Sequence, residues 1–221
     1  MLQFNKIDII KNKEIEKEFV VSTYNKIAKN FSDTRYAVWN SVTEFINEIP
    51  INSSVLEVGC GNGKNMMLRN DLNFDGCDIS KEFVKMCKCK GLNVIEANNL
   101  NLPYNDNIYD YTLSVAVIHH LSTENKRLKS IKELIRVTKP GGKIFIEVWA
   151  FEQGKDSRIK FNHQDVIVPF KDKISRKVIG NRFYHVFKIG ELIDLISNIT
   201  NVKIIKEFYE KGNWVTILQK L

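Results

Sequence analysis

Three glycines and a carboxylate downstream of them form the pattern in this chain that most clearly predicts chemistry. The segment SSVLEVGCGNGK runs from an apolar strand into Gly59, Gly61 and Gly63. Glycine permits a tight turn and lets a ligand approach the backbone closely. Asp78 ends the next apolar segment, 19 residues after Gly59, where a carboxylate can accept both hydrogen bonds of a ribose diol. The pattern therefore predicts a ligand of nucleotide type at this turn.

Two ligands suit such a turn, NAD and S-adenosylmethionine. The spacing is GxGxG rather than the GxGxxG of dinucleotide sites, and Glu57 stands just before the loop. A carboxylate in that place repels a pyrophosphate but attracts the ammonium and sulfonium charges of S-adenosylmethionine. Both features favour S-adenosylmethionine.

The turn must be positioned by an alternating α/β pattern. Helices are predicted over 11–31, 42–49, 81–90, 123–138 and 191–199, with a short one from about Lys64. Between them lie the strand-like segments SSVLEV, NFDGCD, LNVIEA, YDYTLSVAV and KIFIEVWA, and the chain closes with VKIIKEFYE and NWVTILQK. Strands that alternate with helices predict a parallel sheet with helices on both faces. The final pair adds an antiparallel edge.

Composition limits the class of protein. The chain has 221 residues, 43% hydrophobic and 27% charged, which fits a single domain over 1–221 and excludes collagen-like and disordered classes. The four cysteines form no CxxC pair, so we expect no metal site. No run of 18 apolar residues or signal peptide is apparent. We expect a reduced protein of the cytoplasm, with the nucleus as an alternative.

The positive charge is concentrated in one segment. The net charge is +7, and residues 151–188 contain nine Lys or Arg against four acids, a local charge of +5. This segment is the first place to look for an anionic partner.

The chain resembles the class I methyltransferases in four segments. Their glycine motif reads like EVGCGNG, and Asp78-Ile79-Ser80, SVAVIHHL (114–121) and TKPGG (138–142) match further motifs. The resemblance implies a Rossmann-like, seven-stranded, mostly parallel sheet with an antiparallel last strand. The fourth-strand segment lacks the Pro-Pro motif of amino-directed DNA methylation, and no cysteine follows a proline as base C5 methylation requires.

Longer segments are similar to one family, the eukaryotic tRNA wobble-uridine carboxymethyl methyltransferases. They are YNKIAKNFSDTRYAVW, LNLP, VIHHLST, WAFEQG, QDVIVPF, RFYHVFKIGEL and YEKGNW. The resemblance implies transfer of a methyl group from S-adenosylmethionine to the carboxylate of 5-carboxymethyluridine in tRNA. Many family members carry a longer Lys-rich insertion between the VPF-like and RFYH-like segments, which is short here. A carboxylic acid has a pKa of about 4, so its methylation needs no general base.

The resemblance assigns roles to individual residues. The acceptor candidates are Arg35, His119, Trp149 and Arg182, with Arg35 as a carboxylate clamp and Trp149 as a stacking surface. Each has a structural alternative: a surface or capping arginine, a packed histidine, a core tryptophan and an anchored loop. The cofactor-binding candidates are Tyr24, Glu57, Gly59, Gly61, Asn62, Gly63, Asp78, Ile79, Asn98, Asn99, Leu100 and Val115. Asn98 stands where family members often have an aspartate for the adenine amino group.

Two regions outside the sheet also receive predictions. Helices within 1–50 should cover the cofactor, and 151–187 should form a basic lid near the acceptor. A charge run is usually a solvated face, but Phe161, Phe170 and Phe183 interleave with this one and favour RNA contact. Its RNA-binding candidates are Lys155, Arg158, Lys160, Lys171, Lys173, Arg176, Lys177, Tyr184 and His185.

A protein partner is implied as well. Family members resemble one another in needing a small zinc-binding activator subunit, which covers the edge formed by the third strand. LNVIEA (92–97) is that strand here, and an apolar edge strand is a surface that a partner can cover. Two other functions stay open: a small-molecule methyltransferase, and a non-catalytic RNA-binding protein, against which the intact glycine loop argues.

Overall fold

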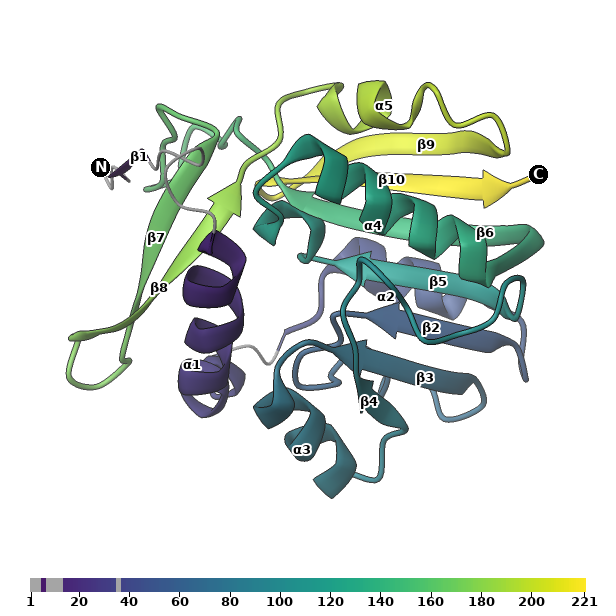
Figure 1. Cartoon of the computed structure of the whole chain (residues 1–221), viewed down its shortest axis with the longest axis horizontal. Helices are drawn as coiled ribbons and strands as arrows, with labels where there is room; N and C mark the ends of the chain where they lie inside the picture. The colour runs from purple at the N-terminus through teal and green to yellow at the C-terminus, as the bar shows by residue number, and fades with distance from the viewer. Residues whose placement is uncertain (1–4, 7–13, 35–36) are drawn as a thin grey trace.

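The computed structural model describes residues 5–6, 14–34 and 37–221. Its centre is a seven-stranded sheet of β2 (Ser54–Val58), β3 (Asn73–Asp78), β4 (Val94–Glu96), β5 (Tyr109–Val115), β6 (Thr138–Trp149), β9 (Val202–Glu210) and β10 (Asn213–Lys220). The strand order is β4-β3-β2-β5-β6-β10-β9, as Figure 1 shows. Only β10 runs antiparallel to its neighbours. The predicted sheet is confirmed, including the third strand of the α/β core, β4, at one edge.

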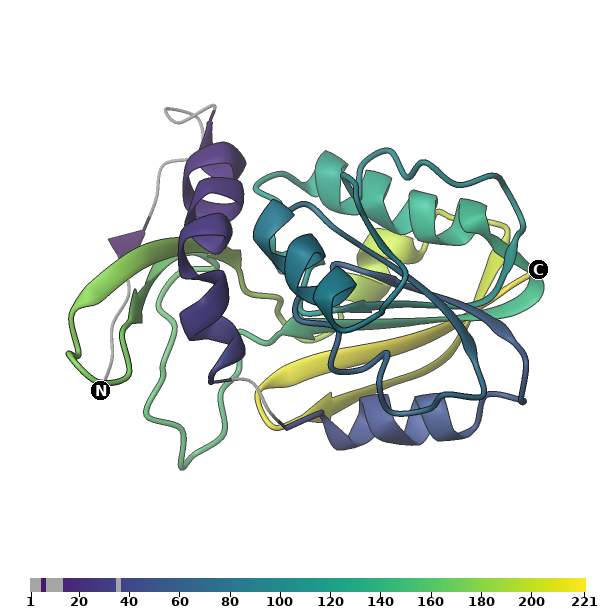
Figure 2. The same ribbon diagram turned by 90° about the horizontal axis from the view of Figure 1, so that it is seen from below.

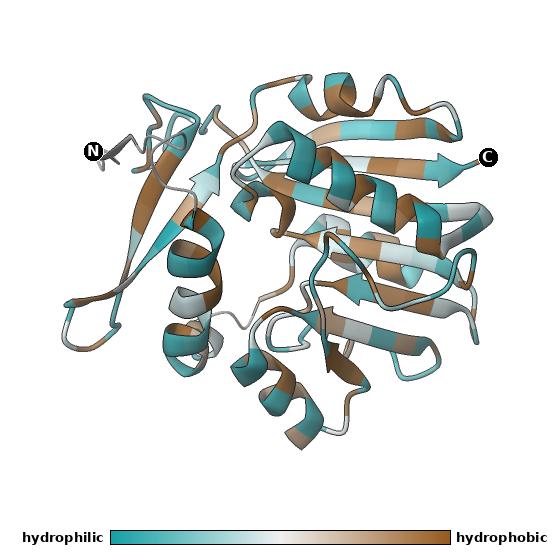
Figure 3. Cartoon of the chain, in the orientation of Figure 1, coloured by the Kyte–Doolittle hydropathy of each residue, from teal (hydrophilic) through white to brown (hydrophobic). Residues whose placement is uncertain are grey.

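Helices cover both faces of this sheet. They are α2 (Asn40–Asn47), α3 (Lys81–Cys89), α4 (Glu124–Val137) and α5 (Glu191–Ile196). On one face α4 packs Ile131 and Leu134 against Ile144 and Ile146 of β6, and α5 joins the same cluster. On the other face α2 packs Phe45 against β6 and β2; Figure 2 shows α2 and α4 on opposite sides. Figure 3 shows hydrophobic and hydrophilic residues alternating along α4, as one buried face requires.

A second, smaller sheet projects from the core as an arm. It has the order β1-β7-β8, with β1 (Asn5–Lys6), β7 (Asp165–Lys171) and β8 (Val178–His185). The basic segment predicted as a lid therefore contains a β-hairpin, which we term the arm. These strands have weak sequence signals, because Pro169 lies within the apolar residues of β7, and Gly180, Asn181 and Arg182 interrupt those of β8.

Helix α1 (Thr23–Ser32) stands between the arm and the core in both views (Figures 1 and 2). A π-helical turn, Lys17–Ser22, leads into it; residues 11–13 of the predicted first helix lie outside the described residues. Gly180 of β8 lets α1 approach closely, because a Cβ there would lie 2.9 Å from the Thr23 side chain. The Thr23 hydroxyl donates a hydrogen bond to the Asn181 carbonyl at 2.8 Å.

The helix predicted from Lys64 is absent; residues 64–72 form turns.

Two other observations concern the described part of the chain. The KPGG segment, predicted as a turn, lies within β6, where a register shift lets the strand continue. No helix among the described residues has the length and apolar character needed to cross a bilayer.

Candidate active site

The glycine loop follows β2 and is held in place by the end of β3. Gly59, Gly61 and Gly63 all have positive φ angles, of 75°, 54° and 73°, which side chains other than glycine rarely adopt. The Gly61 amide donates to Asp78 Oδ2 and the Ser80 amide to Asp78 Oδ1, each at 2.8 Å. Asp78 therefore shapes the loop while each carboxylate oxygen retains a lone pair for a ligand hydroxyl.

This loop fits S-adenosylmethionine. A Cβ at Gly61 would meet nothing within 4 Å, so backbone faces open space there. Burial raises the pKa of Asp78 to about 6, although the Ser80 and Gly61 amides oppose the shift. Asp78 is thus mostly ionised at neutral pH, as a bond to a ribose diol requires.

Glu57 lies beneath the loop rather than on its surface. Its Oε1 accepts a hydrogen bond from Asn65 Nδ2 at 2.6 Å, and Oε2 has no partner among the described residues. Burial raises the pKa of Glu57 to about 8. A cationic ligand above it would hold this carboxyl group ionised.

The asparagines after β4 have a local role. Asn98 is exposed, and its side-chain oxygen accepts a hydrogen bond from the Leu100 amide at 2.9 Å. The Ala97 amide donates a hydrogen bond to the Asp78 carbonyl, which holds the turn after β4 beside the end of β3. Contact of Asn98 or Asn99 with the adenine stays a prediction.

Helix α1 is tied to the same loops. Asn62 of the glycine loop donates to the Ser32 hydroxyl at 3.1 Å, and the Ser80 hydroxyl donates to Asn25 at 2.8 Å. Helix α1 therefore lies against the glycine loop, whereas α2 packs on the sheet face. That helices within 1–50 cover the cofactor stays a prediction.

Hydrogen bonds join α1 to the residues predicted to bind the acceptor. Arg182 Nη1 donates to the Tyr184 hydroxyl at 2.7 Å, and this hydroxyl lies 3.5 Å from that of Tyr24. The Tyr24 hydroxyl lies 2.9 Å from His120 Nε2, and His120 Nδ1 lies 2.7 Å from the Phe183 carbonyl. Because a carbonyl only accepts, Nδ1 carries the proton of His120 and Nε2 accepts from Tyr24. Tyr24 and His120 therefore link α1, β5 and β8, a role for His120 that its sequence position did not reveal.

His119 has the opposite tautomer. Its Nδ1 accepts a hydrogen bond from the Trp149 backbone amide at 2.9 Å, which leaves the proton on Nε2. Burial, together with the neighbouring His120 and Arg182, holds its pKa well below the usual value. His119 is therefore a neutral N–H donor and cannot act as a charged acid.

Aromatic rings surround His119. The Tyr184 ring lies 4.9 Å from the His119 ring and 4.7 Å from the half-buried Trp149 ring, and Phe161 packs on Trp149 at 4.9 Å. The structure thus brings together three of the four predicted acceptor residues, His119, Trp149 and Arg182. Arg35 lies outside the described residues.

Arg182 is a buried cation without a carboxylate partner among the described residues. It is 7% exposed, its guanidinium carbon lies 5.2 Å from the ring centres of Phe170 and Tyr184, and its Nε has no hydrogen-bond partner. A buried charge is costly unless it is paired. The site is therefore built to receive an anion.

The predicted RNA-binding residues fall into three groups. Lys171, Lys173, Arg176 and Lys177 are exposed at the turn of the β7–β8 hairpin, which we term the arm tip. Lys155 and Arg158 are exposed in the loop after β6, and Lys160 there bonds to the carbonyls of Gln153 and Gly154. Tyr184 and His185 are buried, and both ring nitrogens of His185 face carboxylates. Neither residue presents a surface to RNA.

Solved structures share this fold. The CcbJ methyltransferase of Streptomyces caelestis matches with a TM-score of 0.69 at 12% identity, covering 90% of this chain and 98% of that one. The [4+2]-cyclase SpnF matches with a TM-score of 0.65 at 12% identity, covering 92% and 98%. Because SpnF is a cyclase and both identities are low, these likenesses show the fold alone.

Sequence comparison defines the class. Residues 56–146 match a family model described as a methyltransferase domain. Together with the sheet order and the loop on Asp78, this match makes the protein a class I methyltransferase whose cofactor is S-adenosylmethionine.

Curated relatives define the family. A tRNA (carboxymethyluridine(34)-5-O)-methyltransferase of Schizosaccharomyces pombe is 36% identical over 94% of this chain and 98% of its own length. The tRNA (carboxymethyluridine(34)-5-O)-methyltransferase of Arabidopsis thaliana is 50% identical over 63% of this chain, and that named alkbh8 of Xenopus tropicalis is 32% identical over 94% of it. The chain spans only 35% and 41% of those two relatives. It belongs to the family of tRNA (carboxymethyluridine(34)-5-O)-methyltransferases.

The role of Asp78 predicts a pH dependence of cofactor binding. We expect Asp78→Asn to weaken S-adenosylmethionine binding by roughly 10- to 100-fold at pH 7.5, because bonds to a charged acceptor are lost. Wild-type affinity should fall as the pH drops through about 6, where Asp78 protonates, and the variant should lack this fall. Isothermal titration calorimetry measures both effects.

The exposed Asp156 provides the matched control. Asp156→Asn should bind the cofactor with wild-type affinity at each pH. An Asp78→Asn protein that binds with wild-type affinity would show that the carboxylate does not hold the cofactor.

Proposed function

We propose that this chain methylates the carboxylate of 5-carboxymethyluridine at the wobble position of tRNA, giving the methyl ester. Three relatives are named for that activity; the chain matches one of them over nearly its whole length and two over part of their length. The observation that carries the proposal is Arg182, a buried cation that packs against aromatic rings and lacks a carboxylate partner among the described residues.

The charge and hydrogen-bonding groups of this cluster suit the acceptor. Arg182 attracts the carboxylate, and the neutral N–H of His119 offers a second hydrogen bond to it or to the uracil ring. The half-buried Trp149 offers a ring face on which the base can stack. S-adenosylmethionine, when bound, supplies an electrophilic methyl group.

The reaction requires alignment more than acid–base chemistry. A carboxylate oxygen forms the new bond to the methyl carbon as the sulfur–methyl bond breaks, and no proton is transferred. The acceptor is already ionised at pH 7, so a neutral His119 is compatible with the step. Since opposite charges are neutralised, a buried pocket that excludes water favours the reaction.

The direct test offers labelled S-adenosylmethionine to tRNA that bears carboxymethyluridine and, separately, to small carboxylic acids. The proposal expects an alkali-labile methyl ester on the RNA. Turnover on small acids with no RNA product would instead support a small-molecule methyltransferase.

Replacement of Arg182 separates acceptor binding from folding. We expect Arg182→Met to lower kcat/KM for the tRNA by roughly 10- to 100-fold, the effect of losing a charge-assisted hydrogen bond. The Kd for S-adenosylmethionine should not change. The melting temperature should hold or rise, because an unpaired buried charge is removed; a large fall would mean that Arg182 is chiefly structural. Lys203→Met, an exposed cation on β9, is the control.

The arm tip is the proposed contact to tRNA phosphates. We expect Lys171→Gln, Lys173→Gln and Lys177→Gln together to raise KM for tRNA about tenfold with kcat unchanged. The slope of log affinity against log salt should fall by about 2 to 3, because each phosphate contact contributes about 0.7 to 0.9. The exposed lysines Lys129, Lys132 and Lys203 on α4 and β9 provide a control of equal charge. An equal loss in both triple variants would show that only net charge matters.

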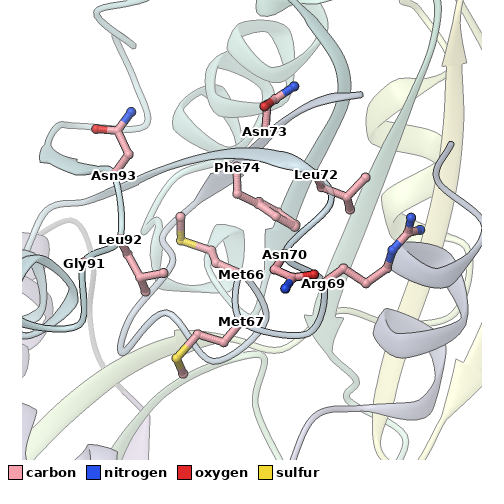
Figure 4. Close-up of a pocket in the computed structure, with 10 residues that line it drawn as sticks. All are labelled: Met66, Met67, Arg69, Asn70, Leu72, Asn73, Phe74, Gly91, Leu92 and Asn93. Carbon is pink, nitrogen blue, oxygen red and sulfur yellow. The ribbon is translucent and has the colours of Figure 1, made fainter. Parts of the chain in front are cut away.

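A small zinc-binding activator subunit is the proposed protein partner, and the β4 edge its docking place. Strand β4 has three residues and pairs only with β3 among the described strands. A surface cavity of about 510 Å³ adjoins it, shown in Figure 4 and lined in part by Met66, Met67, Phe74 and Leu92. An open strand beside an apolar cavity supports capture of a partner strand.

The two edges of the sheet allow a matched test. We expect Met67→Asp, at a side chain in the cavity that is 52% exposed, to abolish co-purification with the activator. Ile205→Asp, at a 46% exposed side chain on the opposite edge strand β9, should leave the complex intact. The reverse pattern would place the partner on β9.

A further inference from the structure

A buried charge cluster surrounds His185 at the base of the arm. His185 Nδ1 lies 2.8 Å from Asp165 Oδ1 on β7, and Nε2 lies 2.6 Å from Glu191 Oε1 at the start of α5. The histidine is 6% exposed. Because ionised carboxylates only accept hydrogen bonds, both ring nitrogens must carry a proton. The geometry is that of an imidazolium ion.

The remaining neighbours balance the charge. Glu191 Oε2 also accepts hydrogen bonds from Gln164 Nε2 at 2.6 Å and the Lys188 amide at 2.9 Å. Arg127 of α4 is buried and interacts electrostatically with Glu191 and Asp165. The neutral His119 also faces His185. The carboxylates of Asp165 and Glu191 therefore lie beside two cations, His185 and Arg127. If His185 loses its proton, the cluster keeps one uncompensated negative charge.

This cluster joins the β7–β8 arm to the core sheet and its helices. Asp165 and His185 are cross-strand partners in the arm. Glu191 and Arg127 belong to α5 and α4, which pack on the core sheet. His185 directly follows Tyr184 and lies three residues from Arg182, so a movement at His185 displaces the acceptor pocket.

We propose that protonated His185 is a positioning residue for methyl transfer: its ion cluster fixes the arm, which carries Arg182 and Tyr184, against the core that holds the cofactor. The inference rests on the proposed function, because it assigns the acceptor to the arm. In-line transfer tolerates little misplacement, and a shift of about 1 Å can cost about 100-fold in rate.

The cluster also predicts the direction of a pH effect. Burial alone would lower the pKa of His185, but the hydrogen bonds to Asp165 and Glu191 outweigh it, so the pKa is raised. For a raised histidine pKa, the contribution is complete below about 6.5, the unfolded value, and is lost as the pH rises through the folded value. The arm should therefore loosen on the alkaline side.

The experiment measures kcat for carboxymethyluridine tRNA, and amide hydrogen exchange of the β7–β8 arm, from about pH 6 to 9 (the range around a histidine pKa). We expect wild-type kcat to decline on the alkaline side while arm exchange, corrected for its intrinsic pH dependence, increases. His185→Gln should have a roughly tenfold lower kcat at pH 6.5 and neither alkaline change. Glu191→Gln should move both changes to lower pH, because one hydrogen bond to the imidazolium is weakened. The Kd for S-adenosylmethionine should be the same in all variants.

His163→Gln is the matched control, since His163 is exposed and lies on the same segment; it should behave as wild type. The comparison also separates His185 from Glu57 and Glu147, whose pKa values are about 8. If His185→Gln keeps the wild-type alkaline changes and only melts earlier, His185 is structural and the inference is wrong. If the wild type binds S-adenosylmethionine but never methylates the tRNA, the proposed function fails, while hydrogen exchange still decides whether His185 anchors the arm.

Discussion

The residues proposed to bind the acceptor are arranged around one physical constraint, a positive charge that is buried away from water. Arg182 is buried between Phe170 and Tyr184, and no carboxylate of the described residues bonds to it. Such a charge destabilises a protein unless an anion completes it. The aromatic rings, the neutral His119 and the hydrogen bonds that run from Tyr184 through Tyr24 to His120 hold the side chains around this cation in place.

In the proposed reaction, the core binds the cofactor and the arm binds the acceptor, so the contacts between core and arm determine the geometry of transfer. The core holds the glycine loop on Asp78, and the arm carries Arg182. Helix α1 bridges them through Asn25 and Tyr24, and the His185 cluster joins them a second time. Since methyl transfer to a carboxylate needs no general base, the protein's contribution is alignment and exclusion of water. This division explains why most polar contacts near the site are structural.

The sequence predicted the core well because its signals are local. The glycine spacing, Asp78 and alternating apolar segments define the sheet and the loop, and the final two strands pair antiparallel as expected. It failed where long-range geometry decides. Residues 64–72 form turns in place of the predicted helix, and proline or glycine interrupts the apolar residues of the arm's strands. The burial of Tyr184 and His185 depends on contacts with α1 and α5. Proximity of His119, Trp149 and Arg182 followed only from the resemblance to relatives. The pairing of His185 with two carboxylates had no sequence signal, since Asp165 and Glu191 lie 20 and 6 residues away.

The central claim is that Arg182 recognises the acceptor by its negative charge. The most direct measurement compares the affinities of the wild type and Arg182→Met for two anticodon stem-loops, one with carboxymethyluridine and one with its uncharged carbamoylmethyl isostere, in the presence of S-adenosylhomocysteine. The account predicts that the wild type binds the carboxylate RNA at least tenfold more tightly, as a charge-assisted hydrogen bond implies, and that Arg182→Met binds both RNAs equally. Equal affinity of the wild type for the two RNAs, or an unchanged preference in the variant, would contradict it.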